Sequence, residues 1–402
     1  MRTPSGTMTT PSIRAAGIAA GLAATWFLAG APVSLVAQDG RPAEAAEMIA
    51  AIEGVQVGDS VGALGRFTLE ELLDTLNVPG LSLAVIHGFE VHWAKGYGVR
   101  DVTTGAPVDT ETVFQAASIS KPVAAMGSLR AVQDGLFGLD DDVNDHLVSW
   151  RLDGADFTDR YAVTPRTLMS HVSGLGDAFG FPGYDPAGPL PTVVQILDGE
   201  APSNTRPLFM EREPWAAFEY SGGGVTLQQL LLEDVRGRPF AEVLADDVLG
   251  PLGMTRSTFE QPMPSTFASN AARAHDGAGE VRGEARWHVY PEQAAAGLWT
   301  TATDLARFAI EVQRSIRGES NRVLDRVHAR EMVTPVGVGD YAVGFGMRAG
   351  GQGRYFGHGG SNWGFRGDLM AHTVKGYGYA ALTNGDRGGQ LIAEIRRRIE
   401  RA

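Results

Sequence analysis

Apolar residues recur three or four positions apart in the segment that follows Ser118. The repeat consists of Val123, Met126, Leu129, Val132 and Leu136. Residues at this spacing share one face of a helix, so the pattern predicts a helix that Ser118 opens and that stops near Gly135 or Gly138. A second repeat predicts a packed terminal helix rather than a basic nucleic-acid arm, although it contains three consecutive arginines. It consists of Leu391, Ile392, Ile395 and Ile399.

Short apolar runs punctuated by glycine predict strands towards both ends of the chain. They are residues 81–87, 90–97, 341–348, 354–358, 367–374 and 377–383. Helical patterns dominate elsewhere, in 41–76, in much of 117–290, after Thr300, where Thr303-Asp304 is expected to cap, and at the C-terminus. The predicted fold class is therefore α+β, with one antiparallel sheet flanked by helices and built from both ends of the chain. Its sheet lobe would comprise about 64–116 plus 295–402, and an inserted, mainly helical lobe about 117–294.

The first forty residues have the pattern of a secretory signal. Arg2 and Arg14 are basic, residues 15–30 are small and apolar, and no acidic residue precedes Asp39. This pattern predicts a signal peptide over 1–37, with cleavage after Ala37 or, as second choice, Ala31. An uncleaved anchor is the alternative, although the stretch is short for a span of about 20 residues. The mature domain would be 38–402, periplasmic or secreted.

Composition narrows the chemistry. Cysteine is absent, which excludes disulfides, thiolate metal sites and cysteine nucleophiles. An exported chain without cysteine suggests a bacterial periplasm or exterior. The net charge of −13 opposes nucleic-acid binding. The histidines are scattered and H-E-x-x-H does not occur, so neither a metal nor another cofactor is expected.

Ser118 and Lys121 are the first candidate catalytic pair. Three residues apart on a helix, they would meet as nucleophile and base of a serine-lysine acyl-transfer site. Only three of the 34 basic residues are lysine. Arginine cannot lose its proton in a protein, so a lysine kept at this position favours a base. The alternative is structural, with Ser118 as an N-cap and Lys121-Pro122 in the first turn.

Three other segments contain candidate residues. Tyr220 precedes Ser221 and Gly222 in a loop ahead of an apolar helix, and a tyrosine can shuttle protons. His358 is expected to end a strand, and the glycine-rich turn after it could offer backbone amides to an oxyanion. The alternatives are an ordinary loop tyrosine and a β-turn with a neighbouring histidine. His171, at the end of a predicted helix, is interpreted as structural.

Competing motifs are weaker. Gly58-x-Ser60-x-Gly62 lacks the strand before it and the helix after it that a nucleophile elbow requires. Gly344-x-Gly346-x-x-Ala349 matches a dinucleotide pattern without a following helix. The long Gly/Pro loop over 174–191 is a candidate lid or binding loop.

The order and separation of S-x-x-K at Ser118, Tyr-Ser-Gly at Tyr220 and His-Gly-Gly at His358 resemble the class C β-lactamase-like serine hydrolases. This family includes penicillin-binding DD-peptidases, class C β-lactamases, D-aminopeptidases and related esterases. The resemblance covers about Leu72 to Asn384. It implies an acyl-Ser118 intermediate, proton transfer shared by Lys121 and Tyr220, and a site between an antiparallel sheet and a helical lobe.

The resemblance also implies that His358 stands where the family has lysine or histidine in its third motif. The backbone amides of Ser118 and Ser361 would form the oxyanion hole. The substrate-binding positions would be Gly222, Gly359 and Gly360. Glycine at 222 removes an amide side chain that is frequent in the family, and His358 is a weaker cation than lysine near neutral pH.

These departures favour an esterase, amidase or peptidase over an efficient β-lactamase. The hypothesis is an exported serine hydrolase that cleaves an ester, amide or peptide bond of a small-molecule or peptide substrate. β-Lactams and D-amino-acid peptides remain candidate substrates. The alternative is a penicillin- or peptidoglycan-binding protein with little turnover. A purely structural exported protein would require the three motifs to coincide by chance.

Overall fold

The computed structural model describes residues 42–58, 61–154, 161–176, 182–351 and 353–402. The predicted signal peptide over 1–37, with both candidate cleavage sites, lies outside the described residues. Ser60 and part of the 174–191 loop lie outside them as well.

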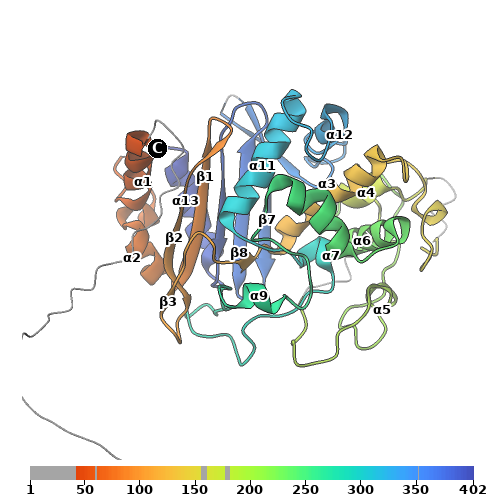
Figure 1. Cartoon of the computed structure of the whole chain (residues 1–402), viewed down its shortest axis with the longest axis horizontal. Coiled ribbons are helices and arrows are strands. Elements are labelled where there is room, and N and C mark those ends of the chain that lie inside the picture. Colours follow the sequence, from red (N-terminus) through yellow and green to blue (C-terminus); the bar gives the residue numbers. More distant parts are fainter. Residues whose placement is uncertain (1–41, 59–60, 155–160, 177–181, 352) are drawn as a thin grey trace, which may run out of the picture. The chain divides into compact units, whose positions relative to one another are not determined.

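A seven-stranded antiparallel sheet holds the fold together, in the order β3-β2-β1-β9-β8-β7-β6 (Figure 1). Its strands are β1 (Gly80–His87), β2 (Glu90–Asp101), β3 (Ala106–Pro107), β6 (Gly346–Gly350), β7 (Gly353–Asn362), β8 (Phe365–His372) and β9 (Gly378–Thr383). β1 pairs directly with β9, with Leu81 opposite Thr383. The prediction of one antiparallel sheet built from both ends of the chain is therefore confirmed. A two-stranded sheet joins β4 (Phe114–Gln115) to β5 (Trp299–Thr300).

Three helices and a 3-10 turn from the two ends of the domain cover one face of the sheet (Figure 1). They are α1 (Pro42–Glu53), η1 (Ala63–Arg66), α2 (Leu69–Thr75) and α13 (Gly388–Ile399). Leu81 and Leu83 of β1 point to this side and are buried with Leu391 and Ile395 of α13. The alternation of strand side chains and the helical stripe thus meet as the sequence predicts.

The opposite face is covered by α11 (Ala302–Arg317) and the helices of the middle of the chain. Those helices are α3 (Ser120–Gln133), α4 (Pro165–Met169), α5 (Val193–Asp198), α6 (Gly222–Arg236), α7 (Phe240–Leu244), α8 (Gly250–Leu252), α9 (Ser265–Ala268), α10 (Gln293–Ala296) and α12 (Arg326–Glu331), with short turns η2 (Ala117–Ile119), η3 (Val143–Asp145) and η4 (Ala245–Leu249). One apolar core runs from Ala84 of β1 to Leu231 of α6. No helix of the described part of the chain is long and apolar enough to cross a bilayer.

Two element boundaries differ from the sequence prediction. α11 starts at Ala302 because the hydroxyl of Thr301 accepts the amide of Asp304 at 3.1 Å, so Thr301 rather than Thr303 is the cap. The predicted strand 341–348 is reduced to β6, which starts at Gly346.

β7 does not end at His358, as the sequence predicted, but continues to Asn362. Its pairing with β8 is uninterrupted from Tyr355 to Asn362, with Gly360 opposite Gly367. At Gly357 and Gly360 a backbone carbonyl oxygen, of Leu369 and of Ala116 respectively, occupies the space that a Cβ would need, whereas Gly359 has room for one. The turn follows at Trp363 and Gly364.

Candidate active site

Ser118 lies in η2, the short turn that leads directly into α3. Ala117 before it has φ 51°, a left-handed conformation that is uncommon outside glycine and that often accompanies functional sites. α3 starts at Ser120 rather than at Ser118, and no side chain caps it. The N-cap interpretation of Ser118 is therefore wrong, and its half-buried hydroxyl lies beside Lys121 instead.

Lys121 is 2% exposed, and its ammonium group is fixed by contacts from two other segments. Its Nζ lies 3.1 Å from the Oγ of Ser118 and donates to the carbonyl oxygen of Ala295 in α10 at 2.8 Å. The ring centroid of Tyr220 lies 4.8 Å from the same nitrogen. The helix spacing thus brings serine and lysine together as the sequence indicated, and α10 holds the lysine in place.

Tyr220 reaches this point from the start of α6. Ser221 is the N-cap of that helix, and its Oγ accepts the amide of Gly224 at 3.0 Å. Because the cap fixes the first turn, the residue before it has a defined direction. The ring centroid of Tyr220 lies 6.0 Å from that of His358. Three segments far apart in the sequence therefore converge on one place.

His358 approaches from the middle of β7. Its Nδ1 lies 2.6 Å from the carbonyl oxygen of Gly359, so this nitrogen has the proton and donates it. Its Nε2 is buried and has no hydrogen-bond partner among the described atoms. Burial and the nearby charge of Lys121 lower the pKa of His358 to about 3. The imidazole is therefore neutral at pH 7, with a lone pair on Nε2.

One edge of β7 pairs with β8, and the other edge pairs with β6 only as far as Gly357. From His358 onwards, this second edge has no strand beside it among the described residues and faces the site. Asn362 and Phe365 flank the two-residue turn as a direct pair. Since alternate residues of an antiparallel strand direct their amides to opposite sides, Ser361 directs its N–H away from β8. A Cβ at Gly360 would collide with the carbonyl oxygen of Ala116, next to the turn that contains Ser118.

The three predicted substrate-binding glycines have different surroundings. Gly222 is the first residue of α6 and is buried, Gly359 is exposed, and Gly360 is half-buried where β7 meets the η2 turn. Of the three, Gly360 is the one that meets the turn containing Ser118, through Ala116 and Ala117. A binding role for all three glycines remains a prediction.

Two aromatic residues that the sequence analysis did not place in the site are packed against it. His171 is 1% exposed, and its ring centroid lies 4.4 Å from that of Tyr220. Tyr341 lies 4.9 Å from His171 and 6.1 Å from His358, between ring centroids. Burial raises the pKa of Tyr341 well above its usual value, and the neighbouring Tyr220 adds to the shift. The interpretation of His171 as a residue at the end of a helix missed this contact, because it depends on residues fifty positions away.

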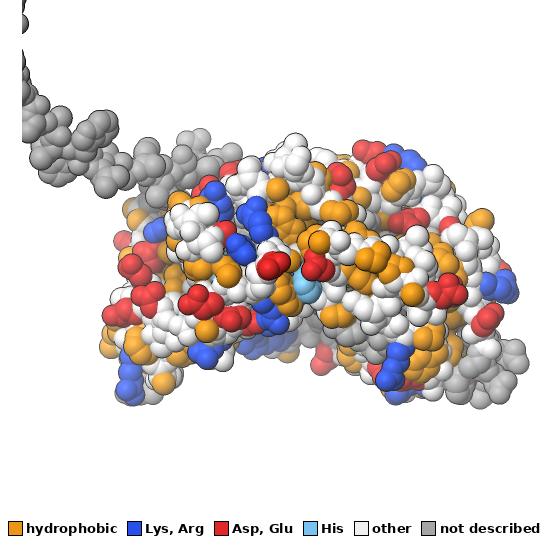
Figure 2. Space-filling model, turned by 90° about the horizontal axis from the view of Figure 1, so that it is seen from below, with side chains coloured by type: hydrophobic (Ala, Val, Ile, Leu, Met, Phe, Trp, Pro, Cys, Tyr) orange, Lys and Arg blue, Asp and Glu red, His pale blue; other side chains and the backbone are white. Residues whose placement is uncertain are grey.

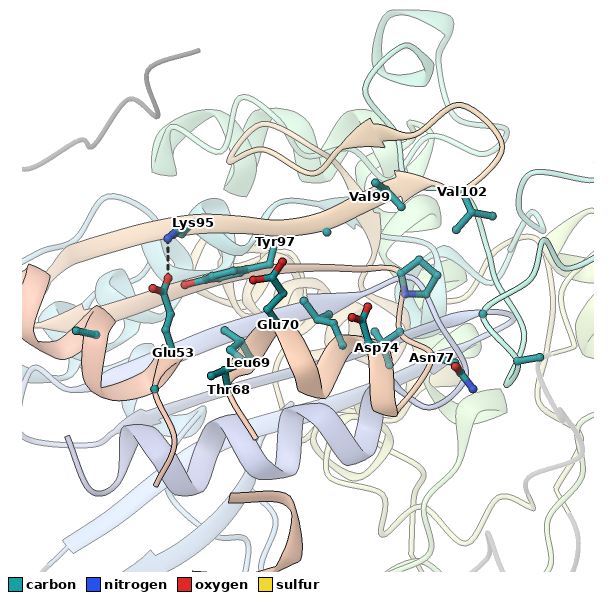
Figure 3. Close-up of a pocket in the computed structure, with 18 residues that line it drawn as sticks. Glu53, Thr68, Leu69, Glu70, Asp74, Asn77, Lys95, Tyr97, Val99 and Val102 are labelled. Atoms are coloured by element: carbon teal, nitrogen blue, oxygen red, sulfur yellow. Dashed lines mark hydrogen bonds and ion pairs between the residues drawn. The ribbon is translucent and has the colours of Figure 1, made fainter. Parts of the chain in front are cut away.

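Within the described residues, no group of three or more His, Cys, Asp or Glu could hold a metal ion. A cavity of about 990 Å³ lies elsewhere, between α1, α2 and β2 (Figure 3). Lys95 of β2 and Glu53 of α1 form an ion pair of 2.6 Å at its edge. None of the candidate catalytic residues lines this cavity, so it is separate from the cluster around Ser118.

Comparisons with known proteins identify the family and the fold. The family model described as Beta-lactamase matches residues 67–402. Penicillin-binding protein 4* of Bacillus subtilis (strain 168) is 27% identical over 198 residues, which are 48% of this chain and 41% of that protein. The chain spans less than half the length of the first curated relatives that it matches.

Two solved structures share the fold. The octameric penicillin-binding protein homologue from Pyrococcus abyssi has a TM-score of 0.63 and 25% identity, and the match covers 79% of this chain and 73% of that one. The D-amino acid amidase from Ochrobactrum anthropi SV3 complexed with L-phenylalanine has a TM-score of 0.69 and 22% identity, with 88% and 99% covered. The second likeness, at this identity, supports the fold alone.

Proposed function

The chain belongs to the beta-lactamase family, and we propose that it is a serine hydrolase that acts through an acyl-Ser118 intermediate. The observation that supports this proposal best is the 3.1 Å contact between the Nζ of Lys121 and the Oγ of Ser118. A nucleophile and a base within hydrogen-bond reach, with the base held by a third group, form the arrangement that acyl transfer needs. The bond cleaved would be an ester, an amide or a peptide bond.

Acylation begins with a proton leaving Ser118. When Lys121 is neutral, the Oγ–H donates to its Nζ along the same contact, and the oxygen attacks the carbonyl carbon of the substrate. Tyr220 lies against Lys121, which lets the two residues share the proton and deliver it to the leaving group. The acyl group is then bonded to Oγ and the leaving group departs protonated.

The developing oxyanion would be bound by the backbone amides of Ser118 and Ser361. The Ser361 amide is directed away from β8, and the short approach at Gly360 brings this part of β7 next to the η2 turn. Fixed N–H donors of this kind stabilise a tetrahedral intermediate without reorganising. Water then attacks the acyl-enzyme, with Tyr220 and Lys121 reversing their proton roles.

His358 favours neutral substrates at this site. A histidine that is uncharged at pH 7 cannot supply the permanent cation that would hold a substrate carboxylate. We therefore propose esters, amides and uncharged peptide ends as better substrates than β-lactams, which have a carboxylate. The missing side chain at Gly222 supports the same preference, because no side-chain amide can bind an acylamino group there.

The proposal includes export to the periplasm or the exterior, based on the leader pattern over 1–37. The mature domain over 38–402 would then combine a sheet lobe, about 64–116 and 295–402, with a helical lobe over about 117–294. Mass spectrometry of the N-terminus of the protein recovered from its host would identify a cleavage site. An intact N-terminus on all molecules would contradict export by a cleaved signal.

Hydrolysis of p-nitrophenyl butyrate tests the catalytic pair. Ser118→Ala should abolish turnover because it removes the hydroxyl that lies 3.1 Å from the Nζ of Lys121. Lys121→Arg should be nearly as damaging because arginine cannot act as a base. Each variant should keep the far-ultraviolet circular dichroism of the wild type. Activity of Ser118→Ala above a few per cent would overturn the acyl-serine mechanism. A stable penicillin adduct on Ser118 without turnover would indicate a binding protein instead.

A further inference from the structure

His171 follows α4 and holds the segment that precedes α6. Its carbonyl oxygen accepts the amide of Glu219 at 2.8 Å. Its side chain acts two residues further on, where the Nδ1 accepts the amide of Ser221 at 3.1 Å. The two bonds therefore bracket Tyr220, one on each side of it in the sequence.

The neighbouring backbone gives this bracket a rigid base. The amide of Trp215 donates to the carbonyl oxygen of Val172 at 2.7 Å, and the amide of Glu211 donates to that of Gly174 at 2.8 Å. The chain after His171 thus lies along the segment that leads to Tyr220. Positive φ at His171, 61°, turns its ring towards Tyr220 rather than continuing the helix.

We propose that His171 is a positioning residue that sets the place of the Tyr220 side chain beside Lys121 through the Nδ1 bond to the amide of Ser221. The inference rests on the proposed function, because Tyr220 has a proton-transfer role only in that reaction. His171 contacts the ring of Tyr220 at 4.4 Å between centroids. Its described side-chain contacts are with Tyr220 and its neighbours and not with Ser118, so it acts through the tyrosine.

The bond requires a neutral imidazole. An N–H faces the Nδ1, so a proton on that nitrogen would set two donors against each other and break the bond. The ionisable groups that face His171 are Lys121 of α3, Tyr220 before α6, Tyr341 before β6 and His358 of β7. Burial, and then the positive charge of Lys121, hold the pKa of His171 well below its usual range. The Nδ1 therefore stays an acceptor throughout the neutral range.

A pair of variants separates the effect of losing the hydrogen bond to the Ser221 amide from the effect of losing the imidazole ring. His171→Asn keeps an acceptor near the Nδ1 position, whereas His171→Gly has none. Both residues tolerate positive φ, so backbone strain does not distinguish them. Both also remove the imidazole ring, and glycine leaves the larger space because asparagine keeps four side-chain atoms.

We expect His171→Gly to lower kcat for p-nitrophenyl butyrate at least tenfold, with KM within about threefold of the wild-type value. The reason is that a small displacement of a catalytic group can lower the rate by up to about a hundredfold. His171→Asn should retain kcat within about threefold of the wild type. Equal kcat in the glycine variant and the wild type would overturn the inference. So would equal losses in the glycine and asparagine variants.

Hydrogen exchange tests the bracket independently of catalysis. In intact protein, the amides of residues 215–224 should exchange at least tenfold faster in His171→Gly than in the wild type, and at nearly the wild-type rate in His171→Asn. Unchanged exchange in the glycine variant would overturn the inference. Failure of the proposed function has a different signature, which is that the wild type neither hydrolyses the ester nor forms a Ser118 adduct with a fluorophosphonate probe. The exchange result would then still decide whether His171 holds this segment.

Discussion

Gly360 sets how closely two parts of the candidate site approach each other. Any side chain there would meet the carbonyl oxygen of Ala116, which belongs to the backbone and cannot rotate away. The glycine therefore allows β7 to lie against the turn that leads to Ser118. The sequence analysis treated this glycine as part of a turn and a binding surface, whereas its main structural effect is close backbone packing.

Gly360→Ala should lower kcat at least tenfold and destabilise the protein by about 1–3 kcal/mol, because the overpacked contact must separate β7 from η2. Ester hydrolysis and urea unfolding measure the two effects. Gly389→Ala is the control, since a Cβ at Gly389 meets nothing within 4 Å and the residue lies in α13. A Gly360→Ala protein with wild-type kcat would show that the close approach does not matter for catalysis.

The candidate residues that the sequence predicts without reference to a family are those that lie close together along the chain. Ser118 and Lys121 are three positions apart, so helix geometry alone predicts their contact. Tyr220 and His358 required a resemblance to a family, because no local rule relates them to Ser118. The contact of His171 with Ser221 could not be predicted, since it depends on the path of residues 172–174 along residues 211–215.

At the scale of elements, Arg398 ties α13 to the N-terminal helices. Its side chain is fully buried, and its guanidinium donates to backbone carbonyls at the end of α1 and around η1 as well as to Glu394. The carbonyl acceptors are those of Ile52, Gly54, Leu64 and Phe67. One planar group with five donors satisfies several carbonyls at once, which lysine could not do.

Arg398→Met should lower the free energy of unfolding by about 3–5 kcal/mol, because it removes the donor to four backbone carbonyls and to the Oε1 of the buried Glu394, whose Oε2 keeps its contact with Arg397. Urea denaturation measures the loss. Arg397→Met is the matched control, since Arg397 contacts the same Glu394 from an exposed position, and its loss should cost about 1 kcal/mol or less. Equal losses in the two variants would contradict the account of Arg398.

Elements with a strong periodic pattern were predicted well. α13 and α3 have apolar stripes, and the β1–β2 hairpin turns at Gly88, so local sequence determines them. The boundaries that differed depend on partners elsewhere. β7 continues through its glycines because β8 pairs with it over its last residues. A sequence pattern within one segment contains no information about the strand that will pair with it.

At the scale of the whole molecule, ionisable side chains determine how stability responds to pH. The chain has a net charge of −13, and the face shown in Figure 2 has acidic and basic side chains interspersed with apolar ones. Two histidines near Lys121, the buried His171 and the half-buried His358, resist protonation in the folded protein. His171 and His358 both have lowered pKa values in the folded protein, so they bind fewer protons than they do in the unfolded chain.

The free energy of unfolding should therefore fall as pH falls from about 6.5 towards 3. In this range the two histidines bind protons in the unfolded chain but not in the folded protein. His358→Gln should reduce the slope of unfolding free energy against pH by up to one proton, which is about 1.4 kcal/mol per pH unit. Urea unfolding of wild type and variant between pH 4 and 8 measures the difference. Parallel pH profiles would show that His358 is not held neutral.

The pairing of β1 with β9 also governs when a newly made chain can complete its sheet. Leu81 meets Thr383, so nearly the whole chain must be synthesised before β1 has both of its neighbours. Closing so long a loop is slow, and until then β1 has an open edge that can pair with other chains. Ser118 and His358 become part of one site only when the same C-terminal strands have docked. We therefore expect a nascent chain that lacks β9 to expose an unpaired edge of β1 that favours aggregation, and to lack the hydrolase activity proposed above.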